Sequence, residues 1–233
     1  MIKITEKELV KFIDQTNLKP QATEEEMRKF LEEAKKYDFC GVAIMPAWAP
    51  LASKILKGSD VKIVVAIGFP LGTIPTELKV EEVKWVLENS SNCEIDMVMN
   101  IPLLKSGKYV AVRKDIEAVV KAAEGVPVKV IIEVPLLTKD EIVIASLISE
   151  LAGAQYVKTS TGFKGFKGWR PTTAEDVRFI KSVVGDKMKV KAAGGIRTLS
   201  QALEIIEAGA SRIGTSSGVQ IVEDYRRLSK LFP

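Results

Sequence analysis

Residues 61–100 read VKIVVAIGFPLGTIPTELKVEEVKWVLENSSNCEIDMVMN, and this stretch decides the fold. It opens and closes with apolar runs, 61–70 and 94–100, whose length suits buried strands. Between these runs, the apolar residues of KVEEVKWVLENS (79–90) recur at helical spacing. A strand, a helix and a second strand in this order predict two parallel strands joined by a crossover helix.

The same unit repeats along the chain. Apolar runs of this kind occupy 11–16, 40–46, 61–70, 94–100, 128–135, 155–160, 188–195 and 211–218. Helical patterns between them occupy 23–38, 79–90, 113–125, 139–153, 174–185 and 200–209. Eight such units in 233 residues predict an α/β fold, a single (β/α)8 TIM barrel that forms one catalytic domain over 1–233. The alternative is an open doubly wound sheet, which would need a glycine-rich turn where the chain reads IDQTNLKP (13–20).

The composition is typical of a soluble globular protein, with 46% hydrophobic and 27% charged residues. The net charge is only +4 and the basic residues alternate with acidic ones, so we expect no nucleic-acid partner. No apolar run approaches the ~18 residues of a membrane span, and the first residues lack the apolar core of a signal peptide. These features, with only two cysteines, predict a cytoplasmic protein whose Cys40 and Cys93 pack in the interior.

The chain contains no histidine. This absence excludes a Ser-His-Asp triad, a Cys-His dyad and a zinc site with histidine ligands. With two cysteines besides, we expect no metal or other cofactor. Acid–base or nucleophilic chemistry must then come from Lys, Asp, Glu, Tyr or Ser.

Lysine is the candidate nucleophile. The stretch AQYVKTSTGF (154–163) begins as a buried strand and then places Lys158 where another apolar residue is expected. Lys191 has the same place on the next strand, in KVKAAGG (189–195), so two cations are expected side by side. Burial and a neighbouring cation lower a lysine pKa from about 10.4, and only the neutral amine attacks a carbonyl. We expect each lysine to lower the other's pKa, so that one attacks a carbonyl while the other, still protonated, supplies charge and moves protons. The alternative is a lysine whose ammonium group reaches water.

Carboxylates follow the same strands. Asp96, in EIDMVMN (94–100), is a candidate for moving protons, although it could simply pair with Lys191. Asp14, on the first strand, is a candidate for orienting a lysine or relaying a proton, with the capping of a turn as the alternative. Glu133 ends the fifth run, where a structural ion pair is the expected role.

Small residues follow the seventh and eighth strands, where TIM barrels bind phosphate. Gly194 and Gly195 allow backbone N–H groups to approach an anion, and Ser216 and Ser217 offer further donors before a short helix. Gly162, after the lysine strand, could contribute in the same way. The residues alone therefore predict a metal-free enzyme that acts on a phosphorylated carbonyl compound through a lysine imine, with an aldolase as the best fit.

Seven segments of the chain, between residues 9 and 222, resemble those of deoxyribose-phosphate aldolases in the same order. They are FIDQTNLKP, VAIGFPLGTIPTELKVEEV, EIDMVMNIPLLKSG, VKVIIEVPLL, YVKTSTGF, VKAAGGIRT and RIGTSSG. The resemblance implies a TIM barrel that reversibly cleaves 2-deoxy-D-ribose 5-phosphate into D-glyceraldehyde 3-phosphate and acetaldehyde. It also implies a metal-independent, cytoplasmic homo-oligomer.

The resemblance assigns roles to matching positions. It places the Schiff base on Lys158, the assisting lysine at Lys191 and the proton shuttle at Asp96, with Asp14 and Thr16 at the wall of the catalytic pocket. The phosphate contacts that it implies are Gly162, Gly194, Gly195, Gly214, Ser216 and Ser217.

The segment KGFKGWRPTTAED (164–176) is longer than the family's usual run of small residues. Lys164, Lys167, Trp169 and Arg170 would line the loop after the sixth strand. This loop is expected either to be an exposed basic loop with a packed tryptophan or to form a rim that gathers phosphate. Another Schiff-base aldolase or transaldolase-like enzyme, and a silent phosphometabolite-binding protein, remain alternatives to the deoxyribose-phosphate aldolase.

Overall fold

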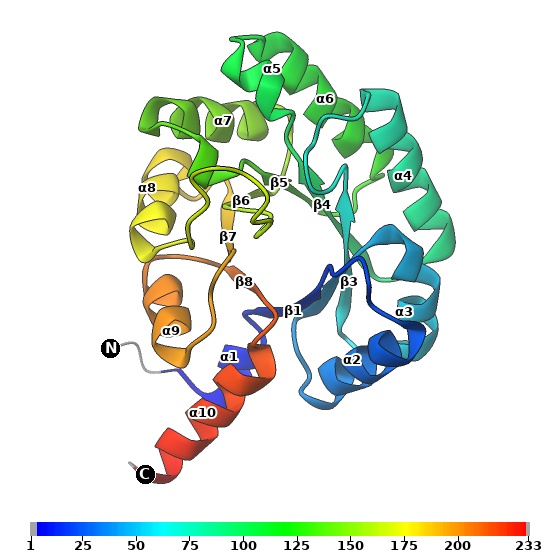
Figure 1. Cartoon of the computed structure of the whole chain (residues 1–233), viewed down its shortest axis with the longest axis vertical. Coiled ribbons are helices and arrows are strands. Elements are labelled where there is room, and N and C mark those ends of the chain that lie inside the picture. Colours follow the sequence, from blue (N-terminus) through cyan, green and yellow to red (C-terminus); the bar gives the residue numbers. More distant parts are fainter. Residues whose placement is uncertain (1–3, 232–233) are drawn as a thin grey trace.

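Eight parallel strands close into a barrel in the order β1 to β8, with β1 paired to β8. The structure is a computed structural model that describes residues 4–231. Figure 1 views it nearly along the barrel, with the strands around the centre and the helices outside them. The strands are β1 (Ile13–Asn17), β2 (Gly41–Ile44), β3 (Lys62–Ile67), β4 (Cys93–Val98), β5 (Val128–Ile131), β6 (Tyr156–Lys158), β7 (Lys189–Ala193) and β8 (Arg212–Thr215).

The barrel predicted from the sequence is confirmed, and the open sheet is excluded because β1 and β8 pair directly. The strands are shorter than the apolar runs that predicted them. The fifth run reached residue 135, but β5 ends at Ile131 because Glu133 adopts a left-handed backbone conformation with φ 54°. The apolar runs therefore predict the first residue of a strand better than the last residue that pairs with a neighbouring strand.

The helices form the outer ring. They are α1 (Glu6–Val10), α2 (Glu24–Lys36), α3 (Ala49–Ile55), α4 (Thr76–Asn89), α5 (Ile101–Lys105), α6 (Tyr109–Ala122), α7 (Lys139–Leu151), α8 (Ala174–Val184), α9 (Leu199–Glu207) and α10 (Gly218–Leu231), with 3-10 turns η1 (Pro46–Trp48) and η2 (Val134–Leu136). The sequence predicted α2, α4, α6, α7, α8 and α9 and missed α1, α3 and α5. It foresaw α10 only as a short helix. Among residues 4–231, every helix is too short or too polar to cross a bilayer.

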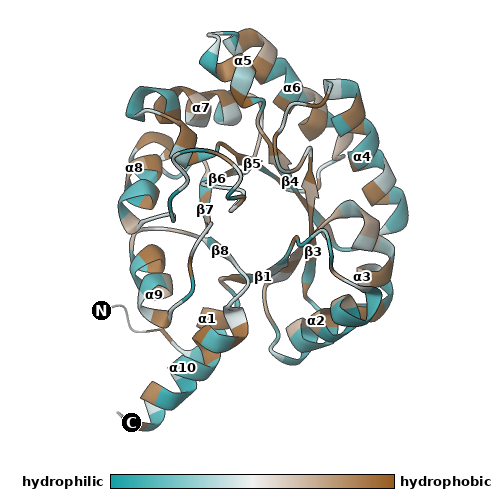
Figure 2. Cartoon of the chain, viewed as in Figure 1, coloured by the Kyte–Doolittle hydropathy of each residue, from teal (hydrophilic) through white to brown (hydrophobic). Residues whose placement is uncertain are grey.

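The helix ends follow from local chemistry. Thr23 caps α2 in a reciprocal capping box with Glu26, and Thr173 caps α8 in the same way with Asp176. The helices carry both apolar and polar residues (Figure 2), and their apolar side chains pack against the strands. The ring of helices therefore buries the outer face of the barrel.

The inside of the barrel is charged. Most TIM barrels fill this space with bulky apolar residues. Buried charged side chains occupy it instead: Asp14, Glu94, Asp96, Lys129, Lys158, Lys191 and Arg212. Each has a partner of opposite charge within 3.2 Å, so the interior is a network of ion pairs.

Candidate active site

Lys158 ends β6 and lies at the carboxyl end of the barrel. The strand register pairs it with Lys191 of β7, as the sequence predicted. Both lysine Nζ atoms lie 2.7 Å from the same oxygen, Oδ2 of Asp96 on β4. All three side chains are almost completely buried. One carboxylate therefore holds the two ammonium groups together.

The two lysines differ in their number of carboxylate partners. Burial and the nearby Lys191 lower the pKa of Lys158 to about 8, although Asp96 opposes the shift. Burial would also lower the pKa of Lys191, but Asp14 and Asp96 raise it by more, and its pKa is above the ordinary value. The prediction that each lysine lowers the other's pKa is thus wrong for Lys191. Near neutral pH, Lys191 stays protonated while part of Lys158 is free amine.

The aspartates anchor Lys191. Asp14 Oδ2 lies 2.6 Å from Lys191 Nζ, and the other oxygen of Asp14 accepts from Arg212 of β8. Burial would raise the pKa of Asp96, but Lys158, Lys191 and Lys129 hold it well below the usual range. Asp96 is therefore ionised near neutral pH. The structure places Asp14 where it orients a lysine, one of the roles weighed from the sequence.

Glu133 does not form the ion pair that the sequence suggested. Its carboxylate accepts hydrogen bonds from the Ser160 hydroxyl at 2.5 Å and from the Thr161 backbone N–H at 3.0 Å. The Thr161 hydroxyl donates to it as well. Glu133 thus holds the loop that follows Lys158, and within residues 4–231 it has no cationic partner.

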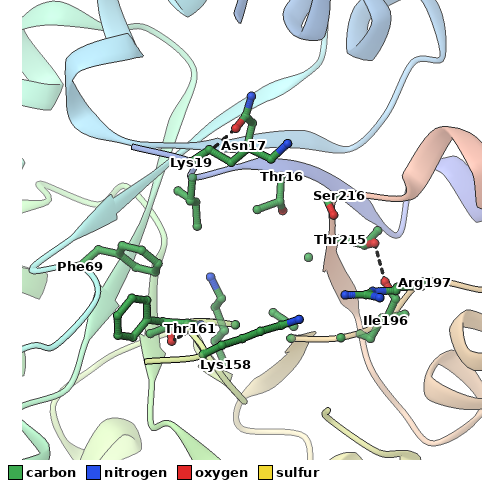
Figure 3. Close-up of a pocket in the computed structure, with 18 of the residues that line it drawn as sticks. Thr16, Asn17, Lys19, Phe69, Lys158, Thr161, Ile196, Arg197, Thr215 and Ser216 are labelled. Carbon is green, nitrogen blue, oxygen red and sulfur yellow. Dashed lines mark hydrogen bonds between the residues drawn. The ribbon is translucent and has the colours of Figure 1, made fainter. Parts of the chain in front are cut away.

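A cavity of about 380 Å³ opens above Lys158. Figure 3 shows Thr215, Ser216 and Arg197 on one side of it and Phe69 and Thr161 on the other. The predicted site residues that line it are Lys158, Thr16, Gly162, Gly194, Gly195, Gly214 and Ser216. Asp14, Asp96 and Lys191 lie beneath it, in contact with Lys158 or with one another.

Two glycines give this cavity its shape. Gly195 has φ 80°, and a Cβ there would lie 2.8 Å from the Pro171 side chain. Gly214 leaves room for its neighbours, because a Cβ there would lie 3.1 Å from Ala193 Cβ and 3.4 Å from Lys191 Cε. A side chain at either position would displace the wall that faces the substrate.

The β8 loop departs from the sequence prediction at Ser217. Ser217 does not line the cavity, and its backbone N–H donates to Thr215 Oγ1 at 2.9 Å. The next N–H, that of Gly218 at the start of α10, donates to Gln15 Oε1 at 2.9 Å. These two amides already have partners, which leaves Ser216 as the residue of this loop that faces the cavity.

Two of the four residues that the sequence singled out in the long loop after β6 line the cavity. Lys164 and Trp169 line the cavity, and Lys164 Nζ lies 4.9 Å from the centroid of the Trp169 ring. Arg170 instead makes two hydrogen bonds to Asp176, at 2.6 and 2.7 Å, and so fixes the loop to α8. Lys167 is exposed and does not line the cavity. The loop is therefore both a basic surface and part of the cavity wall.

Sequence reasoning missed several charged residues. Glu94, Lys129 and Arg212 complete the network inside the barrel, and Lys19 and Arg197 add cations to the cavity wall. The signal that picked out Lys158, a charge within an apolar strand run, also marks Glu94 and Lys129. Arg197 could have been found in AAGGIRT (192–198), beside the predicted glycines.

Other chemistries have little support among the described residues. Within residues 4–231, no group of three or more Cys, Asp and Glu side chains is arranged to hold a metal ion. Cys40 and Cys93 are free and half-buried, and burial raises the pKa of both thiols. Both thiols are therefore weak nucleophiles.

The fold and the site together define a TIM-barrel enzyme with a buried lysine at the carboxyl ends of its strands. Comparison with known proteins then identifies the family. The model of the DeoC/LacD family aldolases matches residues 9–224, and the chain belongs to this family.

Individual relatives agree with this assignment. The chain is 52% identical to the deoxyribose-phosphate aldolase of Thermococcus gammatolerans, covering 94% of this chain and 97% of that protein. It is 53% identical to the deoxyribose-phosphate aldolase of Thermococcus kodakarensis, covering 94% and 98%. Among solved structures, the aldolase QR15 superposes with a TM-score of 0.90 at 39% identity, covering 97% of this chain and 99% of that one. The tetrameric deoxyribose phosphate aldolase of Aeropyrum pernix gives 0.87 at 36% identity, covering 96% and 93%.

Proposed function

We propose that this protein is a deoxyribose-phosphate aldolase that reversibly cleaves 2-deoxy-D-ribose 5-phosphate into D-glyceraldehyde 3-phosphate and acetaldehyde. One observation carries the proposal. The amine of Lys158 lines the cavity and has its pKa lowered to about 8, beside an ionised Asp96 and a protonated Lys191. The family supports an aldolase, and the names of the relatives support this substrate.

The chemistry begins at Lys158. Its neutral amine attacks C1 of the open-chain sugar, and the resulting carbinolamine loses water to give an iminium ion. The iminium withdraws electrons from C2. Asp96, whose carboxylate touches Lys158 Nζ, accepts the C3 hydroxyl proton, directly or through water, and the C2–C3 bond breaks.

Cleavage releases glyceraldehyde 3-phosphate and leaves an enamine on Lys158. A proton returns to C2, and water then hydrolyses the new iminium to acetaldehyde and free lysine. Lys191 remains charged because Asp14 and Asp96 hold it at 2.6 and 2.7 Å, so it keeps a positive charge beside the imine nitrogen. The same steps in reverse join the two aldehydes.

The opposite side of the cavity suits the phosphate. Gly194 and Gly195 follow β7, Ser216 follows β8, and Arg197 adds a cation. Gly162 and Gly214 also line the cavity, and the Ser217 N–H donates to Thr215 Oγ1 from outside it. Thr16 faces the cavity, and its hydroxyl donates to the Asp14 carbonyl at 2.9 Å. Asp14 acts beneath the substrate, through Lys191.

The wider assignments follow from the family and the chain. We propose a single catalytic domain, a cytoplasmic location and a homo-oligomer that needs no metal or cofactor and binds neither nucleic acid nor membrane. A solved relative from Aeropyrum pernix is tetrameric, which supports the oligomer. Residues 1–3 and 232–233 of the domain lie outside the described residues.

Borohydride trapping tests the function. The protein is incubated with 2-deoxy-D-ribose 5-phosphate and sodium borohydride, and peptides are mapped by mass spectrometry. We expect a reduced adduct on Lys158, none in Lys158→Ala, and acetaldehyde released when borohydride is omitted. The equally buried Lys79 serves as the matched control, and Lys79→Met should still trap the adduct.

An adduct on another lysine, or no adduct, would contradict the mechanism. An adduct on Lys158 without acetaldehyde release would reject this substrate and favour another Schiff-base aldolase. Binding of the sugar phosphate that raises the melting temperature without any adduct would favour a silent binding protein.

A further inference from the structure

Asp96 has a third lysine partner that the proposed reaction does not use. Lys129 of β5 is the register partner of Asp96, and its Nζ lies 3.2 Å from Asp96 Oδ1. Lys158 and Lys191 share the other oxygen of the same carboxylate. Lys129 Nζ also lies 2.6 Å from Glu94 Oε2. One aspartate thus has three lysine neighbours, and one of them has a second carboxylate of its own.

Glu94 also has two cationic partners, Lys129 and Arg212. Arg212 Nη2 lies 2.8 and 2.7 Å from its two oxygens, while Arg212 Nη1 contacts Asp14. Glu94 and Arg212 are 7% and 5% exposed, and Lys129 is fully buried. These three residues form a charged layer directly beneath the residues that contact the reactive lysine.

The buried network has more cations than carboxylates. Lys158 contacts Asp96 of β4, and the ion pairs continue from there to charged groups on β1, β5, β7 and β8. Glu133 holds the adjacent loop. The cations are Lys129, Lys158, Lys191 and Arg212, and the carboxylates inside the barrel are Asp14, Glu94 and Asp96. Of these seven, only Lys158 lines the cavity. The network becomes neutral when Lys158 releases its proton to the cavity.

We infer that Lys129 and Glu94 are positioning residues that set the protonation state of Lys158 through their charges. Lys129 adds a cation beside Asp96 and so weakens the hold of Asp96 on a proton at Lys158. Glu94 opposes this effect by pairing with Lys129. The inference rests on the proposed function, because it concerns the amine that forms the imine.

The expected size of the effect is measurable. At an effective dielectric constant near 20, a unit charge about 7 Å away changes a pKa by roughly one to two units. Relaxation of the network would reduce this value, so we expect shifts of about one unit. A shift of this size changes the fraction of neutral amine roughly tenfold below the pKa.

The test uses charge changes of opposite sign. The pH dependence of kcat/KM for 2-deoxy-D-ribose 5-phosphate, and of the rate of borohydride trapping, is measured for each variant. Lys129→Met removes a cation and should move the acidic limb up by about one pH unit. Glu94→Gln removes a carboxylate charge and should move that limb down by a similar amount. The double variant should return close to the wild-type profile, because the two charge changes cancel.

Controls separate charge from structural damage. Lys79→Met removes another fully buried lysine, paired with Asp115 outside the strand barrel, and should leave the pH profile in place. A structural role for Lys129 and Glu94 would lower activity in both single variants without opposite shifts, and that result would overturn the inference. If one single variant does not fold, an unshifted profile in the other overturns it. Absence of trapping in the wild-type protein would instead reject the proposed function.

Discussion

The protein has two regions that bury lysine, and they differ in how the charge is balanced. Between α4 and α6, Lys79 pairs with one carboxylate, Asp115, at 2.6 Å, and donates to the Val98 carbonyl at 3.1 Å. Thr76 donates to the other oxygen of Asp115. This pair has equal charges of each sign and does not line the cavity.

Inside the barrel, four cations share three carboxylates, and Lys158 reaches the cavity. We infer from this comparison that burial alone does not make a lysine reactive. An excess of positive charge and access to a carbonyl compound are needed as well. In the first region the ammonium group is matched by one carboxylate, and in the second the pKa of Lys158 is lowered to about 8.

The largest effect is expected from removing the reactive amine. Lys158→Ala should lower kcat by on the order of 10⁴-fold or more, because the other two lysines that line the cavity, Lys19 and Lys164, are exposed rather than buried beside Asp96. Initial rates of acetaldehyde release measure the loss, and circular dichroism checks that the variant folds. Turnover within tenfold of the wild type would reject Lys158 as the nucleophile.

Lys191→Leu should cost at least about a hundredfold in kcat/KM, the low end for a group that assists proton transfer. Loss of the neighbouring cation should also raise the pKa of Lys158 and move the acidic limb of the profile upward, since Lys191 now lowers that pKa. Lys191→Arg keeps the charge and should return the limb toward its original position. Wild-type rates in Lys191→Leu would show that the second lysine is dispensable.

The sequence predicted the parts of this site that depend on strand order and register. Eight units of strand and helix require the carboxyl ends of the strands to meet, and the matching positions of Lys158 and Lys191 placed them side by side. Asp14 also lies on one of these strands, so the sequence made it a candidate for orienting a lysine, and it contacts Lys191. The position of a residue within a strand follows from the residues next to it in the sequence, so one sequence is enough to predict it.

Partner choice depended on contacts distant in sequence. The pKa of Lys191 is raised because Asp14 and Asp96 approach its ammonium group from two other strands. Glu133 turns toward Ser160 and Thr161 because its backbone leaves the strand direction. The spacing of apolar residues in the sequence does not predict which partners these side chains contact.

A smaller, more selective effect is expected at the phosphate wall. Gly195→Ala would place a Cβ 2.8 Å from Pro171 at a φ of 80°, and so displace the loop after β7. KM for 2-deoxy-D-ribose 5-phosphate should rise about tenfold, the equivalent of about 1.4 kcal/mol. Activity on 2-deoxy-D-ribose, which lacks the phosphate, should change less. Equal losses on both sugars would place the phosphate elsewhere.

The smallest effect on turnover is expected in the balanced region. Lys79→Met leaves Asp115 buried without its cation and should destabilise the protein by about 3–5 kcal/mol, measured by urea unfolding. The kcat of the folded variant should stay within about twofold of the wild type, because this pair is separate from the charges around Lys158. A large loss of kcat with an unchanged unfolding free energy would contradict the separation of the two regions.

Direct titration of Lys158 tests the central claim. Lysine side chains labelled with ¹³C at Cε are followed by nuclear magnetic resonance as pH is raised, and the Lys158 signal is assigned by its loss in Lys158→Ala. The account predicts a midpoint near 8 for Lys158 and no titration of Lys191 below its ordinary range. A Lys158 midpoint at or above about 10.4, the value of a free lysine, would contradict it.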